Sequence, residues 1–237
     1  MTTKYKLVGL AFFLSLFCDA QTSGTILYER KTNLKKLKQW DFPSYKDYIE
    51  ESPTVTENFL LQFNDTCSFY DYEENQSPKN GWMTTKTSYY NSINSQARIV
   101  KFDFWGEEIF IQDTITPIEW KITNNKRTIM EYECVKAIWQ KNDSTRLYAW
   151  FTPLLPVSIG PEGISGLPGA ILGLAREDGS VVYFAKRHTD EFDIRSIRKS
   201  IKTNKRVSKS IFLKKIDENF SNFEWGRFFL ADIKRWF

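Results

Sequence analysis

The sequence is poor in the residues from which most metal-dependent and hydrolytic sites are built. It contains one histidine, His188, and three cysteines in 237 residues. A zinc site with two histidines cannot be assembled from this chain, and a Ser/His/Asp triad would depend on His188 alone. His188 follows Lys186 and Arg187 at the end of a predicted strand, where a surface position is the simplest interpretation. We therefore assign no catalytic residue and expect no metal and no cofactor.

Long hydrophobic runs are equally scarce. The longest extends from Leu7 to Cys18, after Lys4 and Lys6, and it is followed by Asp19-Ala20 before Gln21. This order of charged, apolar and small residues is typical of a secretory signal peptide, and the run is shorter than the roughly 20 residues of a membrane helix. We predict a cleaved signal peptide at residues 1–20, a single mature domain at 21–237 without a transmembrane helix, and export to the periplasm or the outer-membrane surface.

Two cysteines, Cys67 and Cys134, remain after the predicted cleavage. An oxidising compartment favours a disulfide between them, which would close a loop of 68 residues and stabilise the fold by about 4 kcal/mol. The alternative is two separate buried thiols. Sequence alone does not show whether their Cα atoms approach within about 7 Å, so both alternatives stay open.

Charge of one sign is not in large excess, because 33 Lys and Arg face 29 Asp and Glu. A net charge of +4 does not predict nucleic-acid binding. Basic residues do gather in one stretch, 186–215, which holds eleven Lys or Arg and three acidic residues. This stretch fits either contact with anionic headgroups, lipopolysaccharide or an acidic partner, or a pair of solvated strands with basic outer faces. The second interpretation is favoured, because Arg195, Ile197 and Lys199 do not alternate into a dedicated basic stripe.

The main pattern in the sequence is a period-two alternation of apolar and polar residues. Ile26, Tyr28 and Arg30 share one face of such a run, and similar runs recur along the chain between Asn, Asp and Gly turn signals. The pattern predicts a mainly β protein, an antiparallel meander that forms a curved sheet or a partly open barrel. Two segments depart from it. We expect a short helix or loop within 31–53 and a helix near the C-terminus within 214–237.

Glycine and proline are concentrated in one region. Six of the eleven glycines lie between 160 and 179, and four of the eight prolines lie between 153 and 168. The region is not a phosphate loop, because no Gly-Lys-Ser/Thr follows, and Ser165 lacks the flanking glycines of a nucleophile elbow. The favoured interpretation is a structural crossover that plugs or closes the sheet. A binding groove floored by this segment, with Trp150 and Phe151 as aromatic walls, is the alternative.

The same region resembles a known family. The residues that carry the resemblance are the run Ala149-Trp150-Phe151-Thr152-Pro153-Leu154-Leu155-Pro156, then Gly160-Pro161, then Gly166-Leu167-Pro168-Gly169-Ala170-Ile171-Leu172, supported upstream by Gly24-Thr25-Ile26-Leu27-Tyr28, Trp120-Lys121-Ile122 and Tyr132-Glu133-Cys134-Val135-Lys136-Ala137. They are similar to the GLPGLI family of exported envelope proteins of Gram-negative bacteria. Ala170 stands where the motif usually has leucine, and Gly173 where a glutamate commonly follows. The resemblance implies compartment and architecture, but no established activity.

These observations favour a non-catalytic envelope protein that binds another envelope component, a protein or a lipid, through the segment 150–172. The candidate binding residues are Trp150, Phe151, Pro153, Gly166, Leu167, Pro168 and Gly169. We expect substitutions of Leu167 and Pro168 to abolish partner capture without unfolding the protein. A periplasmic carrier of a lipid or other apolar ligand is the alternative, and a hydrolase of unknown substrate is the second alternative.

Overall fold

A computed structural model describes residues 23–104, 107–142, 145–193, 197, 201, 205–224, 226–228, 230 and 233. The predicted signal peptide at 1–20 lies outside these residues, as do Arg195, Arg198, Lys199 and Lys202 of the basic stretch. Nothing in the structure therefore tests either the cleavage site or the basic stretch as a whole.

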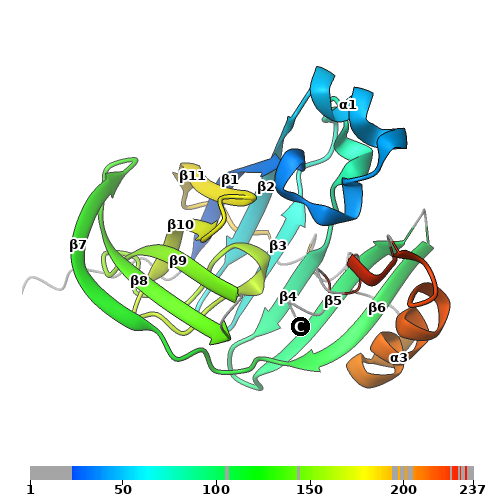
Figure 1. Cartoon of the computed structure of the whole chain (residues 1–237). Coiled ribbons are helices and arrows are strands. Elements are labelled where there is room, and N and C mark those ends of the chain that lie inside the picture. Colours follow the sequence, from blue (N-terminus) through cyan, green and yellow to red (C-terminus); the bar gives the residue numbers. More distant parts are fainter. Residues whose placement is uncertain are drawn as a thin grey trace, which may run out of the picture.

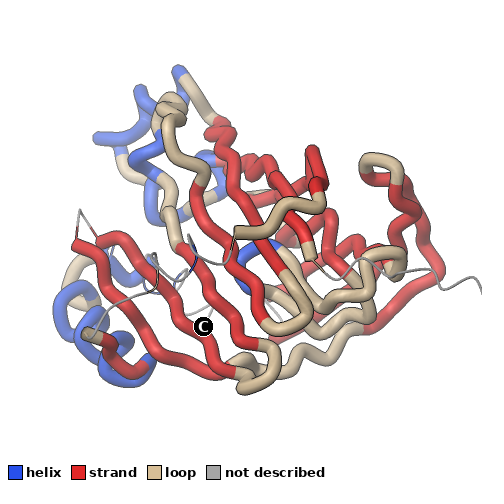
Figure 2. Tube along the Cα trace, turned by 180° about the vertical axis from the view of Figure 1, so that it is seen from behind, coloured by secondary structure: helices blue, strands red, loops and turns tan. Residues whose placement is uncertain are grey.

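The described residues form a 12-stranded, mainly antiparallel sheet that is open rather than closed into a barrel. Its strands are β1 (Gly24–Asn33), β2 (Thr54–Phe63), β3 (Cys67–Tyr72), β4 (Ser88–Ser92), β5 (Ala97–Phe104), β6 (Glu107–Thr114), β7 (Lys121–Ile129), β8 (Tyr132–Asn142), β9 (Thr145–Thr152), β10 (Ala170–Arg176), β11 (Val181–Thr189) and β12 (Arg206–Ser208). They lie in the order β12-β6-β5-β4-β3-β2-β1-β11-β10-β9-β8-β7. Two meanders, β1 to β6 and β7 to β11, thus meet where β1 pairs with β11, and the sheet curls strongly (Figure 1, Figure 2). The predicted fold class is confirmed.

The alternation seen in the sequence creates the core. On β1 the residues Ile26, Tyr28 and Arg30 are buried, while their neighbours along the strand are partly buried or, at Lys31, exposed. Across the β1–β2 ladder Tyr28 faces Phe59, and the two buried faces contribute to one large apolar cluster. The Tyr28 hydroxyl donates a hydrogen bond of 2.6 Å to the carbonyl of Ile171, which ties β1 to β10.

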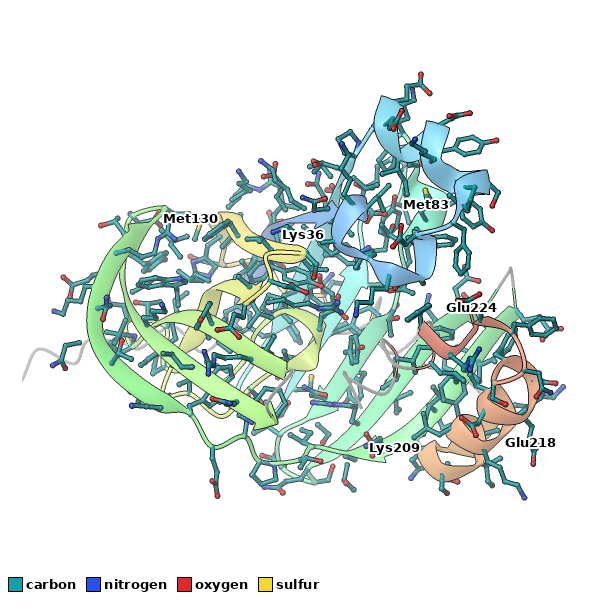
Figure 3. All side chains as sticks on the ribbon, viewed as in Figure 1. Lys36, Met83, Met130, Lys209, Glu218 and Glu224 are labelled. Carbon is teal, nitrogen blue, oxygen red and sulfur yellow. The ribbon has the colours of Figure 1, made fainter. Side chains whose placement is uncertain are left out.

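Helical elements lie in the two predicted regions, although the C-terminal helix begins at Lys209, before the expected range of 214–237. The segment from Leu34 to Glu51 forms three short turns, η1 (Leu34–Lys36), η2 (Lys38–Trp40) and η3 (Pro43–Tyr45), and the helix α1 (Lys46–Glu51). With η4 (Gly81–Met83) they make a cap at one end of the sheet, around a small second core that includes Met83 (Figure 1, Figure 3).

The C-terminal helix α3 (Lys209–Phe220) lies beside β6, which is next to the short edge strand β12 (Figure 1, Figure 3). Its buried residues Phe212, Ile216 and Phe220 recur every fourth position, which is the spacing of one helix face. Ser208 caps the helix by accepting a hydrogen bond from the amide of Ile211. The ammonium group of Lys209 lies 3.5 Å from the carboxylate of Asp113 on β6.

The state of the two mature cysteines was left open by the sequence. Cys67 and Cys134 are buried thiols and are not joined in a disulfide. Cys67 begins β3 and Cys134 lies in β8, and β2, β1, β11, β10 and β9 separate these strands in the sheet order. Of the two alternatives left open, the structure has the separate thiols.

Candidate functional site: a buried charged pocket reached by the Gly/Pro-rich segment

Strand register brings three polar side chains into one row on the buried face of the sheet. Arg30 on β1 is paired with Glu57 on β2 and, on its other side, with Tyr183 on β11. Facing residues on adjacent strands project to the same side, so their side chains are neighbours. The residues are 4%, 1% and 2% exposed, respectively. A buried arginine and a buried glutamate are rare unless they are paired with one another.

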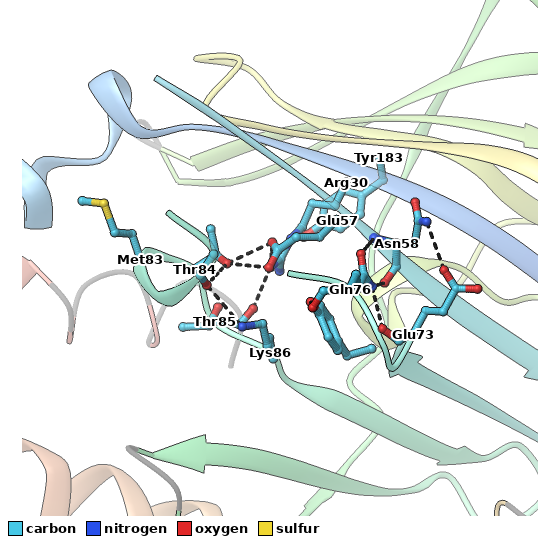
Figure 4. Close-up of polar contacts among 12 residues, drawn as sticks. Arg30, Glu57, Asn58, Glu73, Gln76, Met83, Thr84, Thr85, Lys86 and Tyr183 are labelled. Carbon is cyan, nitrogen blue, oxygen red and sulfur yellow. Dashed lines mark hydrogen bonds and ion pairs between the residues drawn. The ribbon is translucent and has the colours of Figure 1, made fainter. Parts of the chain in front are cut away.

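Arg30 is held from several directions. Its Nη2 donates to Glu57 Oε2 at 2.6 Å and to the carbonyl of Thr85 at 2.8 Å, and its guanidinium lies 4.5 Å from the ring centroid of Phe59. The Thr84 hydroxyl donates to the Glu57 carboxylate, 2.8 Å from Oε1 and 2.9 Å from Oε2 (Figure 4). Burial has the largest single effect on the pKa of Arg30 and lowers it, but Glu57, together with Tyr183, Glu162 and Tyr70, outweighs burial, so the arginine pKa is raised.

The fourth charged member, Glu162, comes from the Gly/Pro-rich segment. It lies in the short turn η5 (Pro161–Gly163) with φ of 55°, the left-handed region that a glutamate rarely adopts. The turn is fixed through the carbonyl of Gly163, which accepts hydrogen bonds from Asn91 at 2.9 Å and Arg98 at 2.8 Å. Gly163 has φ of 66°, and a Cβ there would lie 3.1 Å from the side chain of Tyr89. The backbone shape therefore delivers Glu162 into the core.

Glu162 contacts two residues of the row described above, Arg30 on β1 and Tyr183 on β11. The Tyr183 hydroxyl donates to Glu162 Oε1 at 2.8 Å, and Arg30 Nη1 lies 3.6 Å from the same oxygen. Burial raises the pKa of Glu162 above its ordinary 4.5, and the favourable contacts with Arg30, Tyr183 and Tyr89 offset only part of the rise. Burial likewise raises the pKa values of Tyr89 and Tyr183 well above their usual range, so both hydroxyls remain donors at neutral pH.

These side chains line a small pocket. Its volume is about 50 Å³, and its walls include Arg30, Glu162, Arg176, Tyr89 and Tyr183, together with Gln39, Thr84, Thr85 and Thr87 from the cap and its neighbourhood. A water molecule needs roughly 10–15 Å³ measured in this way, so the pocket has room for a few waters or for one small polar group. Ile233, near the C-terminus, also lines it. Arg30 and Arg176 line the pocket, as does Glu162, and Glu57 is paired with Arg30 behind the wall. The two arginines and the two glutamates therefore balance in charge.

The residues proposed as binding residues are not gathered at one surface. Phe151, Leu167 and Gly169 are buried, whereas Pro153, Gly166 and Pro168 are exposed. Leu167 packs in the main core with Leu155 and Ile164, which agrees with the favoured interpretation of a crossover that plugs the sheet. Gly169 has φ of 153°, and a Cβ there would lie 2.1 Å from the carbonyl oxygen of Thr152, so only glycine fits.

Trp150 lies partly buried on the other face of β9 and does not form a wall of this pocket. Two cations already lie near its ring, Arg127 at 5.1 Å and Lys136 at 5.8 Å from the centroid. Such contacts with surface cations are common stabilising pairs, and they need no ligand.

His188 differs from the expected surface histidine. Its Nδ1 lies 2.9 Å from the Tyr132 hydroxyl, its ring stacks on Phe63 at 6.1 Å, and Nε2 is buried without a hydrogen-bond partner in the described part of the chain. Burial lowers its pKa below the ordinary 6.5, against the opposing effect of Asp190 and Glu131. His188 is not among the residues that line the Glu162 pocket.

Comparisons with known proteins concern two features, the Gly/Pro-rich motif and the overall fold. Residues 140–173 match a family model described as a protein of unknown function (Porph_ging), a span that contains the whole motif from Trp150 to Leu172. No curated protein matches the sequence.

Two structures of PNGF-II, in space groups C2 and P21, are similar to this chain at TM-scores of 0.55 and 0.52 and at 14% and 16% identity, and each comparison covers 79% of this chain and 31% of PNGF-II. An uncharacterized conserved protein from Thermus thermophilus matches at 6% identity and a TM-score of 0.42, over 81% of this chain and 93% of that one. The chain thus spans about a third of the length of PNGF-II, and at this identity the likeness shows a shared fold alone.

Proposed function

We propose that the protein is a non-catalytic, exported binding protein of the GLPGLI type, which captures a polar group of another cell-envelope component in the Glu162 pocket. The observation that carries the proposal is Glu162 itself. It occupies a left-handed backbone conformation, is buried, and points at Arg30 and Tyr183 beside an open volume. A strained residue at a pocket is typical of a functional position.

The pocket supports recognition rather than turnover. Arg30 is fixed by Glu57, Thr85 and Phe59, so its charge is committed to the fold. A volume of about 50 Å³ accommodates the tip of a ligand but not a substrate together with an attacking water. The charges balance, which favours an uncharged polar group with both donors and acceptors, such as an amide or hydroxyl, over a lone ion. This pocket, being small and charged, does not suit an apolar ligand.

Glu162→Gln tests the proposal, because glutamine keeps the shape and the Oε1 acceptor and removes the charge. Immobilised wild-type protein is incubated with solubilised native envelope, and bound proteins and lipids are quantified by mass spectrometry. We expect the wild type to retain one component in stoichiometric amount and the variant to retain about tenfold less or lower, the effect of losing one charged hydrogen bond.

The matched control is Glu177→Gln, an exposed glutamate that contacts Arg146 and Tyr148 and does not line the pocket. It should capture the component as the wild type does. Equal capture by Glu162→Gln would show that the pocket is not the binding site, and a retained phospholipid in place of a polar component would favour the carrier.

A further inference from the structure

A second and larger pocket lies on the opposite face of the sheet from the Glu162 pocket. Its volume is about 510 Å³, within the range of roughly 300–1,000 Å³ that is typical of small-molecule sites. On β1, Thr25 and Leu27 line this pocket, whereas Arg30 lines the Glu162 pocket. Successive side chains of a strand project to opposite faces, so β1 separates the two pockets.

Strand register builds one half of the floor as a polar row. Thr25 pairs with Gln62 on β2 and with Thr189 on β11, and paired side chains project to the same face. The segment after β11 folds back onto this row. The Thr25 hydroxyl donates to the carbonyl of Glu191 at 2.5 Å, and the amide of Asp193 donates to Gln62 Oε1 at 3.3 Å. These two bonds hold the segment as one wall of the pocket.

A β-bulge shapes the other half of the floor. Leu27 on β1 pairs with Arg187 on β11. The next residue of β1, Tyr28, pairs with Ala185, so Lys186 is an extra residue on β11. Without the extra residue, Arg187 would project to the same buried face as Ala185, but with it Arg187 lies beside Leu27 in the pocket. Bulges that redirect a side chain in this way are over-represented next to functional sites.

Opposite charges line the pocket without meeting each other. Arg187 and Glu191 are exposed, and among the residues that the structure describes neither takes part in an ion pair. The neighbouring Lys186, by contrast, lies outside the pocket and 3.0 Å from the carboxylate of Glu29. Because Arg187 and Glu191 are farther apart than the roughly 4 Å of an ion pair, a ligand with an anionic and a cationic group can contact both.

The charges also exclude ligands of a single sign. Asp193 adds a second carboxylate to the lining, which disfavours a purely anionic ligand such as a fatty acid, and Arg187 disfavours a purely cationic one. Leu27, Leu60 and Phe192 are partly buried and form an apolar part of the wall. A short peptide with free termini matches all these features, because it carries a carboxylate, an ammonium group, amide groups and an apolar side chain.

We propose that this pocket binds dipeptides and tripeptides that have free termini and an apolar side chain. The Arg187 guanidinium binds the terminal carboxylate through two parallel hydrogen bonds, and the Glu191 carboxylate binds the terminal ammonium group. The apolar side chain packs on Leu27 and Leu60, and the peptide amide faces the polar row. Within the described part of the chain this pocket shares no lining residue with the Glu162 pocket, so the proposal does not depend on the function proposed above.

Isothermal titration calorimetry with dipeptides and tripeptides that contain one leucine tests the proposal. The strongest binder is then measured in three forms, with free termini, N-acetylated and C-amidated. We expect wild-type protein to bind at least one free peptide, and each blocked form to bind about tenfold more weakly, since each block removes one charge-assisted hydrogen bond.

Two variants assign the termini. Arg187→Gln should weaken binding of the free peptide about tenfold and bind the free and amidated forms equally well. Glu191→Gln should weaken it to a similar extent and bind the free and acetylated forms equally well. A variant that still distinguishes the two forms assigned to it would contradict the proposed contacts.

Lys186→Gln is the matched control, because it removes a neighbouring charge that lies outside the pocket. It should bind the free peptide as the wild type does, and so should Glu162→Gln, which separates this site from the proposed pocket function. Circular dichroism should show that all variants are folded. Absence of binding to every peptide, equal binding of free and blocked forms, or tighter binding of a fatty acid would overturn the proposal.

Discussion

Glu162 is the residue on which the functional proposal depends, and its environment has a measurable consequence for stability. Burial raises its pKa above 4.5, so the folded protein holds the proton more tightly than the unfolded chain does. A group of this kind contributes stability that is fully present below its unfolded pKa and is lost as the pH rises through the higher folded value.

We therefore expect wild-type protein and Glu162→Gln to have similar free energies of unfolding at pH values below about 4.5, where Glu162 is protonated in both states. As the pH rises above that value, the wild type should lose stability relative to the variant, because glutamine has no proton to release. Denaturant unfolding of both proteins between pH 4 and pH 8 measures the difference. A wild type that gains stability relative to the variant with rising pH would mean that Arg30 and Tyr183 lower the pKa of Glu162.

For single residues, the sequence predicted which positions are buried but not which polar side chains meet in the core. The alternation of Ile26, Tyr28 and Arg30 placed an arginine on the buried face, and the structure confirms it. Glu162 was missed, although it stands between Pro161 and Gly163, where a charged residue inside a backbone-determined turn is a usable signal. Its partners Glu57 and Tyr183 are distant in sequence and meet Arg30 only through strand register, which a single sequence does not specify.

Among the elements, the Gly/Pro-rich segment does two things at once. Most of its apolar residues, including Leu155, Ile159 and Leu167, pack into the main core, and its turn η5 carries Glu162 into the pocket. The sequence indicated correctly that backbone shape is what this segment specifies. It could not show which side chains that shape directs inward, because irregular backbone has no periodicity from which faces can be assigned.

Leu167 and Pro168 should consequently behave differently, contrary to the expectation that both form a contact surface. Leu167 is 2% exposed, so Leu167→Ala should cost about 3 kcal/mol in the free energy of unfolding through lost burial and a cavity. Pro168 is exposed, so Pro168→Ala should change stability by less than about 1 kcal/mol. Urea unfolding measures both. If the two variants prove equally stable, Leu167 is not a core residue.

For the whole molecule, the open sheet explains where binding can occur. Two meanders meet at the β1–β11 pair, and the polar row of Glu57, Arg30 and Tyr183 crosses that junction on the buried face. The cap closes one end of this region and contributes Gln39 and Met83 to the pocket. Within the described residues no helix has the length and hydropathy to cross a membrane. The fold class was predicted from the period-two alternation and the turn signals between the runs. The two helical regions were predicted from the segments that depart from that alternation, and α3 begins at Lys209, before the expected range.

The central claim is that the bound component enters the Glu162 pocket, and a photocrosslinker at the partly exposed edge of the pocket tests it most directly. p-Benzoylphenylalanine replaces Gln39, which lines the pocket, and, as a control, Gln140, which is exposed on β8. After irradiation in native cells, we predict one defined adduct from position 39, none from position 140, and loss of the adduct when Glu162→Gln is added. An adduct from position 39 that persists with Glu162→Gln, or adducts from position 140 alone, would contradict the account.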